Sequence, residues 1–196
     1  MNTDMLIVQV VIVVTLAALL ALAIMAGFRR WRQSRARRRI VRAVEAAALA
    51  ALRDIVLPDG NDGHLHVDFL LMTGRGLLVI DLRDVAGVVF GGEHMNEWTV
   101  MDGIVRATFL NPIEPLYDRV AAVRLLAGDV PVDGRIVFTD RSRFPKGRPP
   151  KVITLSALEA EYPPLGPDAA SEARERYHQA WEQIQKHSEP SPLMRR

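Results

Sequence analysis

The chain has 196 residues, 49% hydrophobic and 24% charged, which excludes a disordered or collagen-like protein and allows one domain with an appendage. It contains no cysteine, so a disulfide framework, a thiolate zinc site and a cysteine nucleophile are excluded. The net charge is +2, but seven arginines lie within residues 29–39, and the chain after residue 39 carries 18 basic and 22 acidic residues. This net charge of −4 argues against a broad nucleic-acid-binding surface on the folded part.

The first long segment, residues 5–28, contains no charged residue. As a helix its 24 residues would extend about 36 Å, enough to cross a bilayer. A cleaved signal peptide is the alternative, since Ala21-Leu22-Ala23 resembles a cleavage site, but the basic residues follow the apolar run instead of preceding it. The positive-inside rule therefore predicts a single-pass protein of the inner (plasma) membrane, with its N-terminus outside and its C-terminal domain cytoplasmic.

Residues 40–57 are predicted to form a helix, because apolar side chains recur at helical spacing and Pro58 follows them. The later elements are strands at residues 65–72 and 77–82 joined by the turn 73–76, strands at 98–101 and 104–110 joined by Asp102-Gly103, a helix at 112–127, strands at 135–139 and 152–155, and an amphipathic helix at about 167–187.

This order predicts an α+β fold in which a central mixed sheet has flanking helices and is preceded by one transmembrane helix. The predicted divisions are an outer tail and transmembrane helix at residues 1–28, an arginine-rich linker at 29–39, a folded domain at 40–165, a C-terminal amphipathic helix at 166–187 and a tail at 188–196.

Two aspartates are predicted to face each other across the first hairpin. If residues 73–76 form the loop, Met72 pairs with Leu77, and counting back along both strands puts Asp68 directly opposite Asp81. Like charges at such positions repel unless a cation lies between them, and Mg²⁺ is commonly held by one or two carboxylates with water and phosphate. The alternative is a structural pair of Asp81 with Arg83, which lies on the same strand face.

Two further candidates have simpler alternatives. Glu45 falls on the apolar face of the predicted first helix, where a boundary residue that reaches solvent is the alternative to a functional acid. His64 and His66 alternate on one strand face, but histidines at a strand entry are more often surface or cap residues than metal ligands. The basic cluster in and next to the loop at residues 140–150, formed by Arg141, Arg143, Lys146, Arg148 and Lys151, either contacts phosphate or is simply solvated.

Several short motifs together resemble a known family. They are His66-Val67-Asp68-Phe69-Leu70-Leu71, Gly76-Leu77-Leu78-Val79-Ile80-Asp81-Leu82-Arg83, Trp98, and Asn111-Pro112. Over about residues 40–127 the sequence resembles the NERD, or nuclease-related, domain. The resemblance implies a fold similar to that of the PD-(D/E)XK restriction-endonuclease superfamily and Mg²⁺-dependent hydrolysis of a DNA or RNA phosphodiester.

The resemblance also implies roles for individual residues. Asp68 and Asp81 match metal-binding acidic positions, Glu45 matches the acid on the first helix, and Arg83 stands where the family has lysine. The acid-x-lysine motif thus reads Asp81-Leu82-Arg83, and the glutamine that commonly follows the Asn-Pro pair is absent. A guanidinium stays protonated and is not a general base, so we expect weakened or lost activity.

These features lead to two hypotheses. The first is a membrane-anchored nuclease-related protein with catalytic residues Asp68, Asp81, Arg83 and Glu45 and Mg²⁺ held by Asp68 and Asp81. The alternative is a non-catalytic, membrane-tethered binding or scaffolding module in which Arg83 neutralises the acidic pair. The expected partners are the membrane and either nucleic acid or another protein.

Overall fold

The computed structural model describes residues 19–25, 27–28, 31, 35–61 and 63–192. The chain divides into two compact units, Met1–Val41 and Arg42–Arg196. Most of the predicted membrane span, residues 5–18 and Ala26, lies outside the described residues. Among the residues that are described, no helix combines the length and the apolar character needed to cross a bilayer.

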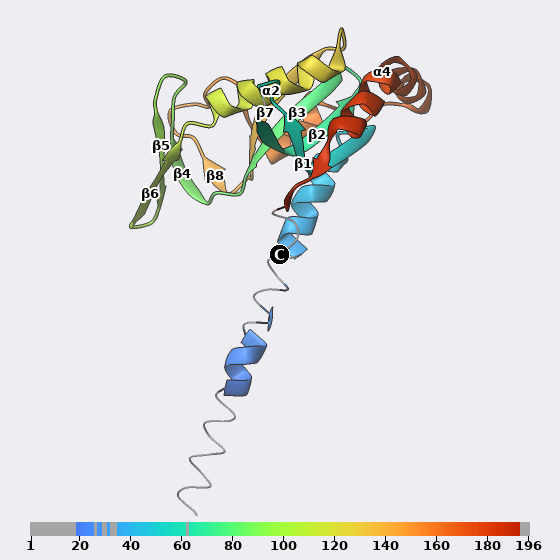
Figure 1. Ribbon diagram of the computed structural model, residues 1–196. Helices are drawn as coiled ribbons and strands as arrows, with labels where there is room; N and C mark the ends of the chain where they lie inside the picture. Colours follow the sequence, from blue (N-terminus) through green and yellow to red (C-terminus); the bar gives the residue numbers. More distant parts are fainter. Residues whose placement is uncertain (1–18, 26, 29–30, 32–34, 62, 193–196) are drawn as a thin grey trace, which may run out of the picture. The chain divides into compact units, whose positions relative to one another are not determined.

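The second unit contains two β-sheets and the helices packed on them (Figure 1). The strands are β1 (Ala50–Pro58), β2 (His64–Thr73), β3 (Gly76–Arg83), β4 (Gly87–Phe90), β5 (Glu97–Asp102), β6 (Val105–Leu110), β7 (Val132–Phe138), β8 (Ser142–Arg143), β9 (Val152–Thr154) and β10 (Glu189–Pro190), and the helices are α2 (Ile113–Ala127), α3 (Leu155–Glu161) and α4 (Pro167–His187).

The larger sheet is mixed and has the strand order β10-β1-β2-β3-β7-β9. Strands β1, β2 and β3 are antiparallel, whereas β7 and β9 run parallel to β3. The smaller sheet has the order β6-β5-β4-β8. The fold is therefore α+β, as predicted, but the hairpin of β5 and β6 belongs to a separate sheet and not to the central one.

The prediction of a helix at residues 40–57 is wrong beyond its first turns. Residues 35–45 are helical, but residues 50–58 form β1, which makes eight registered pairs with β2. The apolar residues Leu52, Ile55 and Val56 fit a strand as well as a helix, and pairing with β2 outweighs the helix preference of the alanine-rich sequence. Pro58 ends the strand, just as it was expected to end the helix.

The two later helices are confirmed with bounds close to the predicted ones, as Ile113–Ala127 and Pro167–His187. The hairpin of β5 and β6 is also confirmed, but its turn is Gly103-Ile104 instead of the predicted Asp102-Gly103, because Asp102 pairs with Val105. Four short elements were not predicted, namely β4, β8, β10 and α3. Helix α3 begins at Leu155, where the sequence analysis expected the end of a strand.

Helix α2 lies across the larger sheet, and its buried side chains form part of the hydrophobic core (Figure 1). Its residues Leu116 and Val120 pack so closely on β7 that a Cβ added to Gly134 would come within 2.7 Å of Val120 Cγ2 and 3.0 Å of Leu116 Cγ. A glycine at this position thus lets the helix approach the sheet backbone. This close packing of α2 on β7 determines which α2 side chains can contact β3.

Candidate functional site

The predicted register of the first hairpin is confirmed. Strands β2 and β3 pair from Thr73 with Gly76 to Phe69 with Ile80. Continued by one position, this register puts Asp68 opposite Asp81. There the Leu82 N–H donates a 2.8 Å hydrogen bond to Asp68 Oδ2. The regular ladder ends at this point, and the Asp68 side chain supplies the acceptor.

A third aspartate, Asp54 on β1, is aligned with Asp68 on β2 and Asp81 on β3. We call these three aspartates the acidic row. The register of β1 with β2 pairs Arg53 with Phe69 and Ile55 with Val67, so Asp54 lies opposite Asp68. Asp54 has φ +50°, a left-handed conformation uncommon for a residue with a side chain. Asp54 was not predicted as a site residue, because its segment was predicted to be a helix, and a helix would not align it with Asp68.

Asp81 is buried and held by two arginines. Its side chain is 2% exposed. Arg83 Nε lies 2.6 Å from Asp81 Oδ1 and forms an ion pair with it, although the N–H is not aligned for a hydrogen bond. Arg83 Nη2 donates a 2.8 Å hydrogen bond to Asp81 Oδ2. Arg119 Nη1 donates to the same Oδ2 at 3.0 Å. Both carboxylate oxygens therefore contact guanidinium groups.

Arg119 also ties α2 to β2, because its Nε donates a 2.6 Å hydrogen bond to the His66 carbonyl oxygen. Arg119 was not predicted as a site residue, although the sequence contains a signal for it. Position 119 lies three residues after Leu116 and four before Val123, within the apolar stripe of α2. A basic residue on the buried face of a helix indicates a buried anionic partner.

His66 lies between two of the aspartates. Its Nδ1 is 3.4 Å from Asp68 Oδ1, and its Nε2 is 3.7 Å from Asp54 Oδ1. The Nε2 atom is buried and makes no hydrogen bond to any part of the chain that the structure describes. The structure thus places His66 within the acidic row, although the sequence analysis favoured a surface or cap residue.

The protonation of Asp68 follows from this environment. Burial raises the pKa of Asp68, and the neighbouring Asp81 carboxylate raises it further. The Leu82 hydrogen bond and the charges of His66 and Arg119 oppose that increase without cancelling it. The site therefore favours a proton on Asp68 more than an exposed aspartate would.

Glu45 lies in different surroundings. Its carboxylate is 3.9 Å from Arg53 Nη1, and the two side chains are 40% and 47% exposed. Within the described ranges, no group of three or more His, Cys, Asp or Glu side chains is placed to hold a metal ion. The structure brings together Asp68, Asp81 and Arg83 and places Glu45 against Arg53.

The arrangement around Asp81 does not fit a divalent cation. Guanidinium nitrogens lie 2.6–3.0 Å from its two oxygens, and the Leu82 N–H occupies Asp68 Oδ2. A cation between the two carboxylates would lie against two fixed positive charges, and this repulsion disfavours its binding. The geometry agrees with the alternative in which arginine neutralises the acidic pair.

Two motif residues support the site from a distance. Asn111 Oδ1 accepts a 3.0 Å hydrogen bond from the Ile113 N–H at the start of α2, and its Nδ2 donates to the carbonyls of Glu93 and Met95 at 2.8 Å. The indole N–H of Trp98 donates to the Gly92 carbonyl at 3.1 Å. These contacts fix the loop before β5 to the beginning of α2, the helix that carries Arg119.

Comparison with known proteins gives one match. A family model described as the nuclease-related domain, NERD, matches residues 32–139, more than half of the chain. This confirms the resemblance identified from the motifs and, with it, the general assignment to the PD-(D/E)XK superfamily, whose members usually bind a divalent metal. No curated protein and no solved structure matches the chain.

Proposed function

Because this chain belongs to the nuclease-related domain family, we propose that it is a membrane-tethered binding module on a nuclease-like fold, with phosphodiester hydrolysis strongly weakened or lost. One observation carries the proposal: Arg83 and Arg119 occupy both oxygens of the buried Asp81. A carboxylate paired in this way stabilises the fold. Mg²⁺ binding at Asp68 and Asp81 would require at least Arg83 to leave.

The charge of the chain favours a protein partner over nucleic acid. The chain after residue 39 carries a net charge of −4, and the acidic excess repels a polyanion. Arg83 and Arg119 both pair with the buried carboxylate of Asp81, and this pairing reduces their attraction for phosphate. We therefore propose a protein scaffold as the main role.

Membrane anchoring is the second part of the proposal. It is supported by the uncharged residues 5–28 and by the seven arginines that follow within residues 29–39. We propose a single pass through the inner membrane, with the folded domain in the cytoplasm. Near an anionic leaflet each of these arginines would contribute roughly 1 kcal/mol to membrane attraction.

The test of activity uses the full chain in a neutral detergent, supplied with Mg²⁺ or Mn²⁺ and labelled DNA or RNA. We expect cleavage by the wild type to equal that of Asp81→Ala, because neither protein presents a free acidic pair. Glu172→Ala, which changes an exposed carboxylate of α4, is the matched control. Cleavage that the control retains and Asp81→Ala loses would refute the proposed loss of activity.

The test of topology is separate. A C-terminal alkaline phosphatase fusion, which is active only outside the cytoplasm, should be inactive, while a C-terminal fluorescent fusion should pellet with membranes after a carbonate wash. A variant with Val11→Asp and Leu16→Asp should lose membrane retention, since charged residues oppose insertion. An active phosphatase fusion would reverse the proposed orientation.

A further inference from the structure

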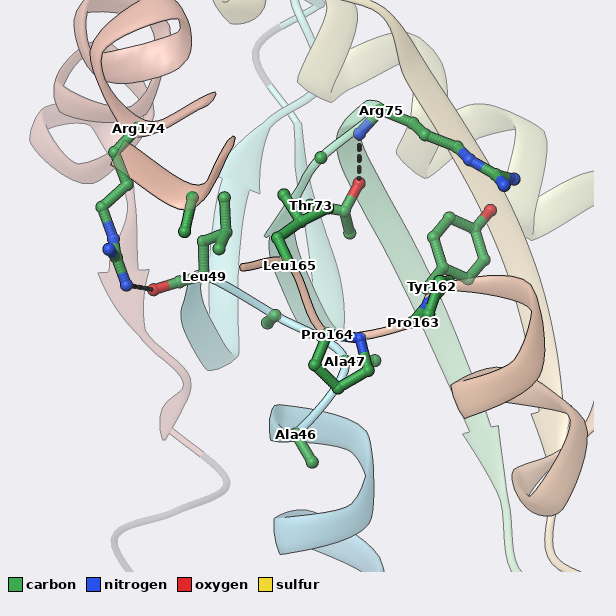
Figure 2. A pocket seen from close by; sticks show the side chains of 13 residues that line it. Ala46, Ala47, Leu49, Thr73, Arg75, Tyr162, Pro163, Pro164, Leu165 and Arg174 are labelled. Carbon is green, nitrogen blue, oxygen red and sulfur yellow. Dashed lines mark hydrogen bonds between the residues drawn. The ribbon is translucent and has the colours of Figure 1, made fainter. Parts of the chain in front are cut away.

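A pocket of about 370 Å³ lies away from the acidic row. It is formed by the segment at residues 46–49, the turn between β2 and β3, the segment that joins α3 to α4, and the first turns of α4 (Figure 2). All of these residues belong to the unit Arg42–Arg196. The volume is within the range of small-molecule sites in proteins.

The walls of the pocket are fixed by packing and hydrogen bonds. Leu165 covers the turn so closely that a Cβ on Gly74 would come within 2.7 Å of Leu165 Cδ1. Thr73 Oγ1 donates to the Gly76 carbonyl at 2.9 Å and accepts from the Arg75 N–H at 3.2 Å. The Leu49 N–H donates to the Met72 carbonyl at 2.7 Å. The pocket is therefore preformed, which lowers the entropy cost of binding.

The charged residues that line the pocket are all cationic. Arg75 and Arg174 are its two charged residues, and none of the lining residues is acidic. In Figure 2, Arg174 lies on one side of the pocket, and Arg75 lies with Tyr162 on the other. Neither guanidinium has a carboxylate within ion-pair distance among the described residues. Arg174 Nη2 makes a long hydrogen bond of 3.4 Å to the Leu49 carbonyl, and Arg75 Cζ is 5.8 Å from the Tyr162 ring centre.

Tyr162 adds a neutral hydroxyl to this cationic rim. Burial raises the pKa of Tyr162 to about 12, so the phenol is protonated at neutral pH. Arg135 also approaches the ring, at 6.0 Å, but it is paired with Asp133 and Glu161. Its charge is therefore compensated, and the uncompensated cations at the pocket are Arg75 and Arg174.

The rest of the lining is apolar. Ala47, Pro164 and Leu165 contribute to the wall between the two arginines (Figure 2). Two cations flanking an apolar surface complement a ligand with an anionic head and a short apolar body. We propose that this pocket binds a small phosphate- or carboxylate-bearing amphiphile, with its anion at Arg174 and its apolar part against Leu165 and Pro164, while Arg75 adds positive charge from the opposite side.

The same chemistry is offered by a soluble phosphate monoester and by the head group of an anionic phospholipid. This inference is independent of whether the acidic row cleaves or binds anything, because no residue is shared between the two sites. Failure of the proposed scaffold role would therefore leave the pocket proposal intact, and the reverse is also true.

The test is calorimetric titration of the full chain, in a neutral maltoside detergent, with butyl phosphate, and with butanol as the uncharged probe. We expect saturable binding of butyl phosphate only. Arg174→Gln should weaken it about tenfold or more, because it removes a charge-assisted hydrogen bond, and Arg75→Gln should have a smaller effect, because Arg75 lies on the opposite side of the pocket. Arg141→Gln, which changes an exposed guanidinium paired with Asp84, is the matched control and should bind as the wild type does.

A second variant blocks the pocket without removing charge. Ala46→Trp places a large ring at an exposed position of the rim and should also weaken binding about tenfold or more. Unchanged unfolding temperatures would verify that each variant is folded. Equal binding of butanol, or affinity unchanged in Arg75→Gln, Arg174→Gln and Ala46→Trp, would overturn the proposal.

A competition arm distinguishes the two sources of the ligand. Phosphatidylglycerol added to the micelles should displace butyl phosphate if the natural ligand is a lipid head group, and phosphatidylcholine should not. Absence of displacement by either lipid, with butyl phosphate still bound, would support the site and assign it to a soluble phosphate ester.

Discussion

The acidic row and the pocket beside Tyr162 each contain two arginines, but the surroundings of these arginines differ. Arg83 and Arg119 contact a carboxylate that is 2% exposed, whereas Arg75 and Arg174 border a cavity without an acidic lining residue. In the first region the cations compensate a buried charge of the protein itself. In the second they are available to a ligand. The partner of an arginine, more than its presence, thus separates a structural site from a binding site.

The strongest test of this contrast is Asp81→Asn. Removing the charge leaves Arg83 and Arg119 uncompensated next to a buried amide, and we expect the free energy of unfolding to fall by about 3–5 kcal/mol. Urea unfolding of the full chain in detergent, followed through the fluorescence of the buried Trp98 and Trp181, measures this change. Glu172→Gln, in an exposed pair with Arg176, should change it by about 1 kcal/mol or less. A loss of similar size in both variants would remove the distinction.

The second test addresses the helix that positions Arg119. Gly134→Ala would place a methyl group 2.7 Å from Val120 Cγ2, and overpacking of this kind costs about 1–3 kcal/mol. Because the pocket does not depend on α2, its affinity for butyl phosphate should stay unchanged. Gly166→Ala, whose Cβ would meet no atom within 4 Å, is the control for unfolding. Equal stability of the two variants would show that α2 can shift without cost.

The sequence predicted the hairpin register well because loop length and strand pattern both constrain it. Asp68 was therefore placed correctly opposite Asp81, and pairing with Arg83 was recognised as an alternative. The segment at residues 50–58 was assigned wrongly, since its apolar spacing fits both a helix and a strand and only the distant β2 decides between them. For the same reason, Asp54 was not predicted to lie beside Asp68.

Arg119 and the pocket were missed for a related reason. Arg119 is 38 residues from Asp81, and its partner is fixed by the seating of α2 on Gly134. The pocket joins residues 46–49 to residues 162–174, a separation that no local motif bridges. Sequence patterns within one element found part of the acidic row, whereas Arg119 and the whole pocket depend on packing between elements.

The third test uses pH. Burial, with a contribution from Asp81, raises the pKa of Asp68, so the folded state binds this proton more tightly than the unfolded chain does. The resulting stabilisation is fully present below the ordinary Asp pKa of about 3.9 and is lost as pH rises through the raised folded-state pKa. Relative to Asp68→Asn, the wild type should therefore gain stability as the solution is acidified from neutral pH. A difference that is constant with pH, or of opposite sign, would contradict the buried setting of Asp68.

The smallest expected effect is that of Glu45→Gln. Glu45 and Arg53 are 3.9 Å apart and both substantially exposed, so the unfolding free energy should change by less than about 0.5 kcal/mol. The family resemblance implies a role for this acid beside Asp68 and Asp81, and a nearby negative charge would raise the pKa of Asp68 as Asp81 does. A double-mutant cycle of Glu45→Gln with Asp68→Asn at several pH values separates the two views. Additivity within about 0.5 kcal/mol would show that Glu45 does not interact with Asp68, whereas a larger, pH-dependent coupling energy would show that the two carboxylates interact.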